Sequence, residues 1–186
     1  MKRRCEWAQI LSIIFSTTKM SLQLNHEQKR FSEKKFPITL ICDRIYFQDN
    51  IGSIFRISEA FGIEKIIFIG ENLPLNPRKI NRTSRSTHLM IPYEVIESED
   101  KIASYLPEYE IIALEITSDS QAIQNINLSN KKIALIIGNE ISGISENLLK
   151  IANQTVHIEM FGKNSSMNVV QATGIALFEI TKKLSI

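Results

Sequence analysis

Short apolar runs alternate with helix-like segments along most of this chain, and this alternation constrains the fold more than any other feature. The runs are almost continuously hydrophobic, which is typical of strands that are buried on both faces of a parallel sheet. Helical patterns separate them, so the sequence predicts an α/β domain with a mainly parallel sheet of five or six strands. The clearest runs are ITLIC at 38–42, KIIFI at 65–69, EIIALE at 110–115 and KIALIIG at 132–138.

Turn signals place the remaining elements. Asn50 is predicted to cap a helix that runs to about Phe61, and Gly62 is predicted to end that helix. The segment 71–90 contains two prolines and is predicted to be a loop with one short basic helix. A last helix is expected at about 168–184, where a wide apolar stripe favours either a subunit contact or a place in the core. We also expect strands near 91–96 and 155–159, helices at 99–106 and 144–152, and a polar loop with a helical turn at 118–130.

The composition fits one globular domain, because 44% of the 186 residues are hydrophobic and 23% are charged. The net charge of +2 does not separate nucleic-acid binding from other functions. The basic residues are clustered, however: no acid occurs between Glu71 and Glu94, and a second basic group precedes the first strand. Each group fits either a solvated face or an anion-binding surface. The two groups are Arg78, Lys79, Arg82 and Arg85, and Lys29, Arg30, Lys34 and Lys35.

Other features restrict the class of protein. Cys5 and Cys42 are interpreted as reduced thiols in a cytoplasmic protein, and the three histidines share no metal-ligand spacing with them, so we expect no metal site. No apolar run approaches the length of a membrane span, so we expect no membrane partner. Residues 1–36 are predicted to be a basic, partly disordered extension, and residues 37–186 one domain. Our hypothesis is that residues 1–19 precede the true start at Met20.

Three polar clusters follow the ends of predicted strands: DNIGSIFR at 49–56, GNEISGIS at 138–145, and the segment 157–168. The ligand crevice of a parallel sheet lies beyond the carboxyl ends of its strands, so the clusters are predicted to share one crevice. Their glycines let the backbone approach a ligand closely. The chain lacks GxGxxG, GxxxxGKS and G-x-S-x-G motifs, which argues against dinucleotide, P-loop and serine-hydrolase chemistry. A triad of Ser166 with His157 is disfavoured, because strand residues alternate in direction.

Together these clusters resemble the three motifs of the SpoU, or TrmH-like, ribose 2′-O-methyltransferases of the SPOUT superfamily. N-x-G-x-x-x-R followed by A-F-G, at 50–62, is similar to the first motif. G-x-E-x-x-G-I-S at 138–145 is similar to the second, and I-x-M followed by S-x-N-V at 158–169 is similar to the third. Order and spacing match across about residues 38–184. The chain departs from the family at Glu159, where proline is common, and at Met167, where leucine is usual.

The resemblance implies a Rossmann-like α/β fold whose C-terminal segment threads a deep trefoil knot, a rare topology in proteins. It also implies a homodimer with the crevice near the subunit boundary, and S-adenosylmethionine (AdoMet) bound within the knot. The residues that it assigns to cofactor binding are Leu114, Gly138, Gly143, Ile158, Met160, Ser166 and Met167. The residues that it assigns to catalysis are Arg56, Asn50, Glu140, Ser166 and Asn168.

The chemistry limits what these side chains can do. Methyl transfer to a ribose hydroxyl is an in-line displacement on an activated donor, so orientation supplies much of the rate, and the hydroxyl must lose its proton. A guanidinium has a pKa above about 12, so we expect Arg56 to clamp the RNA phosphate and the developing oxyanion rather than act as a base. Asn50 and Asn168 would position Arg56 and the ribose, and Glu140 would bind an amide or hold Asn50. Taken singly, these residues also fit helix caps, turns or surface positions.

The sequence therefore predicts AdoMet-dependent 2′-O-methylation of a ribose in structured RNA, either tRNA or rRNA. Two alternatives stay open: a non-catalytic RNA-binding dimer on the same fold, and an α/β protein that binds a nucleotide and acts on a small metabolite. The sequence does not identify the methylated nucleotide, the general base or any accessory protein. The residues expected to contact RNA phosphates are Arg78, Lys79, Arg82, Arg85, Lys34 and Lys35.

Overall fold

A computed structural model describes residues 32–105, 107–164 and 166–185. The chain divides after Glu33, and the unit Lys34–Ile186 contains every helix and strand named below. The expectations for residues 1–19, Met20, Cys5, Lys29 and Arg30 lie outside the described residues.

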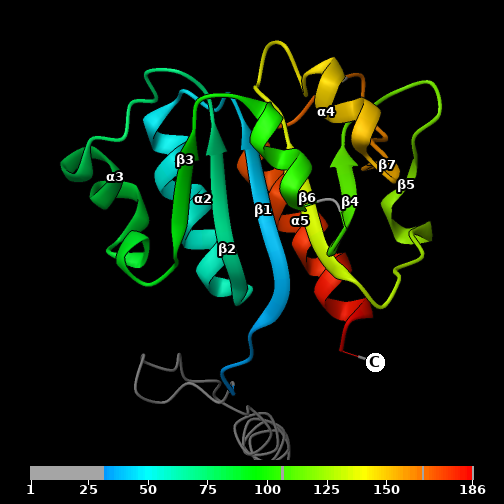
Figure 1. The fold of residues 1–186 in the computed structure, drawn as a ribbon, viewed down its shortest axis with the longest axis horizontal. Coiled ribbons are helices and arrows are strands. Elements are labelled where there is room, and N and C mark those ends of the chain that lie inside the picture. Colours follow the sequence, from blue (N-terminus) through cyan, green and yellow to red (C-terminus); the bar gives the residue numbers. More distant parts are fainter. Residues whose placement is uncertain (1–31, 106, 165, 186) are drawn as a thin grey trace, which may run out of the picture. The chain divides into compact units, whose positions relative to one another are not determined.

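A parallel sheet of seven strands forms the centre of this unit, in the order β3-β2-β1-β6-β4-β7-β5 (Figure 1). The prediction of a mainly parallel α/β sheet is confirmed, although the sheet has more strands than the five or six expected. The additional strand β5 has two residues inside the predicted polar loop, and its pairing with β7 defines it. The strands are β1 (Phe36–Asp43), β2 (Ile63–Ile69), β3 (Tyr93–Ile96), β4 (Tyr109–Leu114), β5 (Gln121–Ala122), β6 (Lys132–Ile137) and β7 (Gln154–His157).

The strand order changes direction at β1. The chain adds β2 and β3 on one side of β1, and then crosses to build β4 on the other side, with β6 between β1 and β4. The carboxyl ends of β1, β6 and β4 therefore open around a topological switch point. Ligands of open α/β sheets bind at such a point, so the topology alone indicates where to look for a site.

Helices cover both faces of the sheet (Figure 1). They are α2 (Gln48–Ala60), α3 (Pro77–Ser84), α4 (Glu146–Ile151) and α5 (Val169–Lys183), with 3₁₀ turns at Thr87–Leu89, Glu99–Tyr105 and Ile123–Asn125. The segment predicted as a helix at 99–106 is thus the 3₁₀ turn Glu99–Tyr105. The short basic helix expected within 71–90 is α3.

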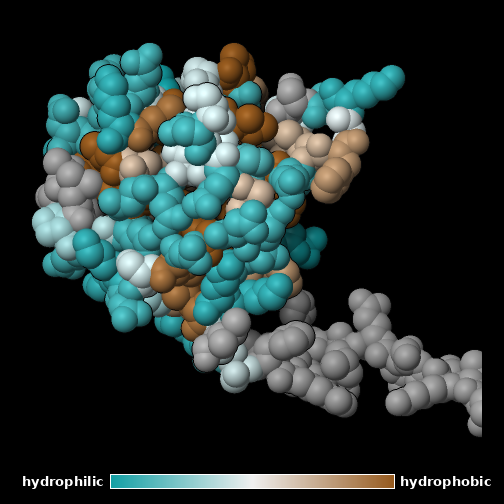
Figure 2. All heavy atoms as spheres, turned by 90° about the vertical axis from the view of Figure 1, so that its right-hand side faces the viewer, coloured by the Kyte–Doolittle hydropathy of each residue, from teal (hydrophilic) through white to brown (hydrophobic). Residues whose placement is uncertain are grey.

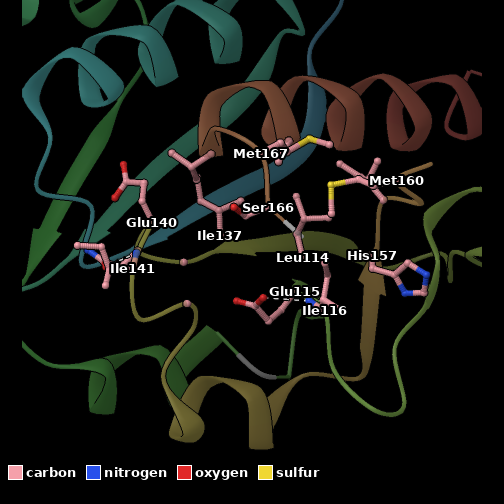
Figure 3. A pocket seen from close by; sticks show the side chains of 16 residues that line it. Leu114, Glu115, Ile116, Ile137, Glu140, Ile141, His157, Met160, Ser166 and Met167 are labelled. Atoms are coloured by element: carbon pink, nitrogen blue, oxygen red, sulfur yellow. Dashed lines mark hydrogen bonds between the residues drawn. The ribbon is translucent and has the colours of Figure 1, made fainter. Parts of the chain in front are cut away.

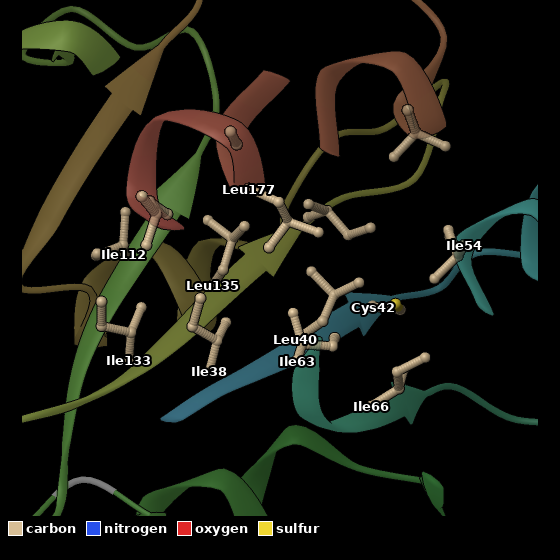
Figure 4. Close-up of a cluster of buried hydrophobic side chains, with 14 of the residues drawn as sticks. Ile38, Leu40, Cys42, Ile54, Ile63, Ile66, Ile112, Ile133, Leu135 and Leu177 are labelled. Carbon is tan, nitrogen blue, oxygen red and sulfur yellow. The ribbon is translucent and has the colours of Figure 1, made fainter. Parts of the chain in front are cut away.

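Alternate strand residues build two separate hydrophobic layers, because successive side chains point to opposite faces of a sheet. Leu40 of β1 belongs to the layer that α2 and α5 cover, and Figure 4 shows Leu177 of α5 in this layer. The next residue, Ile41, belongs to the opposite layer, which contains Ile102 of a 3₁₀ turn and Leu148 of α4. Burial on both faces explains why the strands read as continuous apolar runs.

Helix α2 begins two residues before Asn50, so the prediction that Asn50 caps it is wrong. The cap position is Phe47, whose side chain makes no capping hydrogen bond. Asn50 lies in the first turn, and its amide makes a tertiary contact instead. The end of the helix is as predicted: Gly62 has φ +60°, a left-handed conformation that favours glycine.

Asparagine caps the other two helices that matter for the site. Asn168 Oδ1 accepts a hydrogen bond from the Val170 N–H at 2.8 Å, so Asn168, and not Ser166, caps α5. Asn76 Oδ1 accepts from the first backbone N–H groups of α3. Among the residues that the structure describes, no helix combines the length and apolar character needed to cross a membrane.

Candidate active site

A cavity of about 270 Å³ opens at the carboxyl ends of β4, β6 and β7. Four separate segments line it, namely 114–116, 137–143, 157–160 and 166–172, and Figure 3 shows their side chains converging on one space. The three polar clusters were predicted to share one crevice, and two of them line this cavity directly. The seven residues assigned to the cofactor by resemblance all lie on its wall: Leu114, Gly138, Gly143, Ile158, Met160, Ser166 and Met167.

The turn from Gly138 to Gly143 brings backbone against backbone at the cavity wall. A Cβ on Gly138 would lie 2.4 Å from the carbonyl carbon of Gly143, closer than real side chains come. Gly143 has φ +67°, and its own Cβ would lie 2.6 Å from Glu115 Oε2. Only glycine fits either place, because a Cβ would push apart the two arms of the turn or displace the Glu115 carboxylate.

Hydrogen bonds fix the shape of this turn. The backbone groups of Asn139 and Gly143 bond to each other in both directions, at 3.2 and 2.9 Å. Asn139 Oδ1 also accepts from the N–H groups of Ile141 and Ser142, and Asn139 Nδ2 donates to the Arg44 carbonyl at 2.8 Å. The turn is therefore held to the end of β1 as well as within itself.

Glu115 is a cavity residue that the sequence reasoning missed. Its carboxylate accepts from the backbone N–H of Ile144 at 3.1 Å and of Ile116 at 2.9 Å, and its side chain lines the cavity (Figure 3). The available signal was an acid that ends the apolar run EIIALE. A carboxylate oxygen accepts about two hydrogen bonds, so each oxygen keeps capacity for a ligand donor.

A chain of side-chain hydrogen bonds joins all three motifs. Asn168 Nδ2 donates to Asn50 Oδ1 at 3.2 Å, and Asn50 Nδ2 donates to Glu140 Oε1. Of the two contacts considered for Glu140, the structure therefore shows the one with Asn50. Glu140 Oε2 is buried and makes no hydrogen bond within the described residues. Residues separated by more than a hundred positions in sequence thus meet beside the cavity.

Arg56 is the one predicted catalytic residue that stands apart. It is exposed on α2 and forms no hydrogen bond or ion pair with other described residues, whereas Asn50 and Asn168, which do not line the cavity either, are bonded to its wall through Glu140. It follows Asn50 by six positions, which corresponds to about 9 Å along the helix axis and a third of a turn around it. Asn50, Glu140, Ser166 and Asn168 gather at the site within one copy of the chain, whereas Arg56 does not.

The basic residues assigned to RNA lie in two places. Arg78, Lys79 and Arg82 of α3 line a second groove, beside the loop that connects β1 to α2. Arg85 follows α3 and does not line this groove. Lys34 and Lys35 precede β1, whose eight residues span roughly 25 Å, so they lie at the amino end of the strand and far from both hollows.

Other ionisable groups near the site have structural partners. Burial raises the pKa of the Cys42 thiol well above its usual value, and the charge of Asp43 adds to this rise. His157 Nδ1 forms a hydrogen bond with Ser120 Oγ at 2.9 Å. Within the described part of the chain, no group of His, Cys, Asp and Glu has the arrangement of a metal site.

The fold and the cavity define an α/β protein with a cavity at the carboxyl ends of β4, β6 and β7, on one side of the topological switch point. A profile of the SpoU rRNA methylase family matches residues 37–178, which is more than half of the chain. The chain therefore belongs to the SpoU rRNA methylase family, and it is a methyltransferase.

Individual relatives agree with this assignment. The chain is 28% identical over 156 residues to an uncharacterized tRNA/rRNA methyltransferase of Borreliella burgdorferi, covering 84% of this chain and 68% of the relative. It is 24% identical over 169 residues to the tRNA (guanosine(18)-2′-O)-methyltransferase of Aquifex aeolicus, covering 87% and 79%. The solved structure of an AdoMet-bound rRNA methyltransferase from Sinorhizobium meliloti has the same fold, with a TM-score of 0.73 and 23% identity over 96% of this chain and 78% of that one.

Proposed function

We propose that this chain transfers the methyl group of AdoMet to the 2′-hydroxyl of a ribose in tRNA or rRNA. The observation that carries the proposal is a continuous hydrogen-bonded chain from Asn168 through Asn50 to Glu140, which joins three distant segments and reaches the cavity wall at Glu140. Two comparisons support it: a relative named for 2′-O-methylation of tRNA guanosine, and a structural neighbour bound to AdoMet.

The cavity fits AdoMet in its chemistry. Gly138 and Gly143 line the cavity and let the two arms of its wall pack closely together, and Met160 and Met167 add apolar surface. The Glu115 carboxylate provides acceptors for hydroxyl or amino donors. When bound, AdoMet supplies a methyl group activated by its sulfonium. In this proposal the seven cavity residues named above hold it, within the knot that the C-terminal segment is predicted to thread.

The hydrogen-bonded side chains orient the ribose. Glu140 fixes the amide of Asn50, and Asn50 in turn fixes Asn168, whose Oδ1 is held by the first turn of α5. Such a frame loses little freedom when a substrate binds, and correct orientation of reacting groups contributes up to about 7–11 kcal/mol to a rate. Arg56 then clamps a phosphate and stabilises the developing oxyanion, while water accepts the hydroxyl proton.

In this proposal the protein is a homodimer, and Arg56 reaches the cavity of the second copy. Arg56 is exposed and lies away from the cavity of its own chain. Helix α5, which packs against α2, presents two large apolar side chains to solvent, Ile175 at 41% and Phe178 at 55% exposure. A contact through this face would bury them and bring the second copy beside α2.

The proposed activity is tested by calorimetry with AdoMet and by mapping 2′-O-methyl groups in RNA from a deletion strain. We expect the wild-type chain to bind AdoMet, and we expect one methyl group to be missing from tRNA or rRNA of the strain. Arg56→Ala should abolish transfer and leave AdoMet affinity nearly unchanged. Loss of both properties, or of neither, contradicts the role given to Arg56.

The shared site is tested by mixing two inactive variants. Arg56→Ala and Asn168→Ala copies carrying different tags are co-purified as a mixed dimer. If each site takes Arg56 from one copy and Asn168 from the other, the mixed dimer regains about half of the wild-type activity, because one of its two sites is intact. No recovery in an established mixed dimer, or sedimentation of the wild type only at the 21.3 kDa of one chain, rejects this arrangement.

A further inference from the structure

A second groove, of about 530 Å³, lies between α3 and the loop that connects β1 to α2. The loop contributes Tyr46 and Phe47, the first turn of α2 contributes Gln48 and Asp49, and α3 contributes Arg78, Lys79 and Arg82. We propose that this groove binds an unpaired RNA nucleotide beside the methylated one, with its base stacked on Phe47 or Tyr46 and its phosphate held by the cations. The inference rests on the proposed function for the identity of the RNA, and it adds a site to that function.

The two aromatic residues are not explained by the stability of the fold. Phe47 is 57% exposed and Tyr46 is 41% exposed, so neither is a core residue. Phe47 occupies the cap position of α2 without a capping hydrogen bond, at a place where serine, threonine, asparagine or aspartate would stabilise the helix. Two exposed rings on one loop therefore indicate a surface that receives a flat partner.

The charges of the groove favour an anion. Three cations face a single acid, Asp49, which pairs with Arg82 at 3.3 Å. The side chains of Arg78 and Lys79 make no ion pair or hydrogen bond with other described residues. Both stand in the first turn of α3, where the helix dipole disfavours positive charge, so helix stability does not account for them either. A bound phosphate would reverse that penalty.

Aromatic rings next to guanidinium groups match unpaired RNA better than other partners. Proteins recognise single-stranded RNA by stacking its bases on aromatic side chains and by tracking its phosphates with cations. Double-stranded RNA keeps its bases stacked on each other and offers no free base face. Aromatic and arginine side chains are also enriched at protein–protein interfaces, so the test includes Phe47→Leu, a variant that separates base stacking from an apolar protein contact.

The two sides of the groove are packed together, and the groove is close in sequence to the candidate active site. Phe47 precedes Asn50 by three residues, about 4.5 Å of helix rise, and Asn50 belongs to the hydrogen-bonded chain at the cavity. Gly52 allows α3 to pack closely on α2, since a Cβ there would lie 1.9 Å from Thr83 Oγ1 and 2.8 Å from the Ile80 carbonyl oxygen. Gln48 Nε2 donates to the Pro74 carbonyl at 2.7 Å, which ties the first residue of α2 to the segment before α3.

The test measures binding of the full chain to a labelled RNA hairpin with an unpaired loop, and to a fully paired duplex of the same length, over a range of salt concentrations. Phe47→Ala should weaken hairpin binding by between about fivefold and a hundredfold and leave the salt dependence unchanged. Phe47→Leu should lose as much, because it keeps bulk without a π-face, and Phe47→Trp should retain binding. Duplex binding should not respond to any of the three.

The cations have a different signature. Replacing Arg78 and Lys79 by alanine should lower the slope of log affinity against log salt by about 0.7 for each phosphate that the variant no longer binds. Lys131→Ala is the matched control, because Lys131 is an exposed cation that directly precedes β6 and so lies at the opposite, amino end of the sheet. It should leave both the hairpin affinity and its slope unchanged.

Several results overturn the groove proposal. If Phe47→Ala binds the hairpin as well as the wild type does, no base stacks on Phe47. If Phe47→Leu preserves binding, the contact needs only apolar bulk, as a protein-binding surface would. If the Phe47 variants lose the same affinity for hairpin and duplex, the groove does not recognise an unpaired base. If the wild-type chain binds neither RNA, the groove is not an RNA site. The proposed methyl transfer is judged separately by AdoMet calorimetry. If the wild-type chain methylates RNA and Phe47→Ala does so with an unchanged KM, only the groove proposal is wrong. If the chain does not bind AdoMet but the Phe47 variants change hairpin binding as expected, only the proposed methyl transfer is wrong.

Discussion

Replacing Gly138 by alanine tests the closely packed cavity wall most directly. The added Cβ would lie 2.4 Å from both the Gly143 carbonyl carbon and the Ile144 nitrogen, and 2.7 Å from the Gly143 oxygen. Ordinary contacts between heavy atoms lie near 3.5–4.0 Å, so the two strands of the turn must separate by about 1 Å. All three neighbours are backbone atoms, so no side chain can rotate away to relieve the overlap.

The cost follows from what that movement breaks. Ile144 N–H donates to Glu115 Oε2 at 3.1 Å, and two backbone hydrogen bonds join Asn139 to Gly143. Weakening these three bonds, at about 1 kcal/mol each, gives up to about 3 kcal/mol, which agrees with the range of about 1–3 kcal/mol for overpacked sites. If the displaced cavity wall costs the AdoMet-bound state a similar free energy, AdoMet affinity should fall by about tenfold to a hundredfold.

Gly162→Ala is the matched control, because a Cβ at Gly162 has nothing within 4 Å. Thermal unfolding should show Gly138→Ala below the wild type by about 2–4 °C for each kcal/mol lost, whereas Gly162→Ala should unfold with the wild type. Calorimetry with AdoMet should separate the two variants in the same order. If they have equal melting temperatures and equal affinities, the close approach at Gly138 is not what shapes the cavity.

Three further substitutions test other parts of the structure. Gly174→Ala in α5 should raise the free energy of unfolding in urea by about 0.5–1 kcal/mol, since its Cβ would meet Ile57 only at an ordinary 3.5 Å; a loss of stability would mean that the α2–α5 contact is tighter than described. The raised pKa of Cys42 keeps the thiol protonated in the folded chain. The free energy of unfolding therefore does not change with this group below about pH 8.5, where the unfolded thiol is also protonated. Above that pH it falls by up to about 1.4 kcal/mol per pH unit, because only the unfolded thiol loses its proton. In a chain with Cys5→Ala, adding Cys42→Ala should remove that component of the slope, and urea unfolding between pH 7 and pH 10 measures it. Asn50→Ala should remove about 1.5–3 kcal/mol of bonding to Glu140 and sharply lower methyl transfer while AdoMet affinity is kept; transfer at the wild-type rate would exclude Asn50 from the site.

The sheet could be predicted from the sequence because each central strand is buried on both faces. ITLIC and KIALIIG are continuous apolar runs of the kind found in strands of a buried parallel sheet, and they form the adjacent strands β1 and β6. Strand β5 could not be found in this way, because two residues carry no hydrophobic period and only their pairing with β7 makes them a strand. Strands that are buried on both faces could therefore be predicted from the sequence, whereas a strand defined only by its pairing could not.

The site shows the same limit at the level of single side chains. Asn50 directly before a helical pattern is a common capping signal, but its amide oxygen accepts from Asn168 and its amide nitrogen donates to Glu140, ninety residues later. The cap position falls instead to Phe47, which no capping rule would select. A local rule fails at this loop because two tertiary demands override it: the hydrogen-bonded chain to the cavity and, in our proposal, the stacking surface of the second groove.

The position of Arg56 is the clearest sign that one copy of the chain does not bring all the predicted catalytic residues together. Sequence spacing places it six residues after Asn50, and a helix turns such a pair toward different directions regardless of the surrounding fold. Because α2 is fixed against the sheet by Ile51, Ile54 and Phe55, all fully buried, the helix cannot rotate to bring Arg56 to the cavity without exposing them. A motif can therefore specify both residues while the geometry of one helix keeps them apart, and a second copy of the chain would resolve this conflict without any change in the fold.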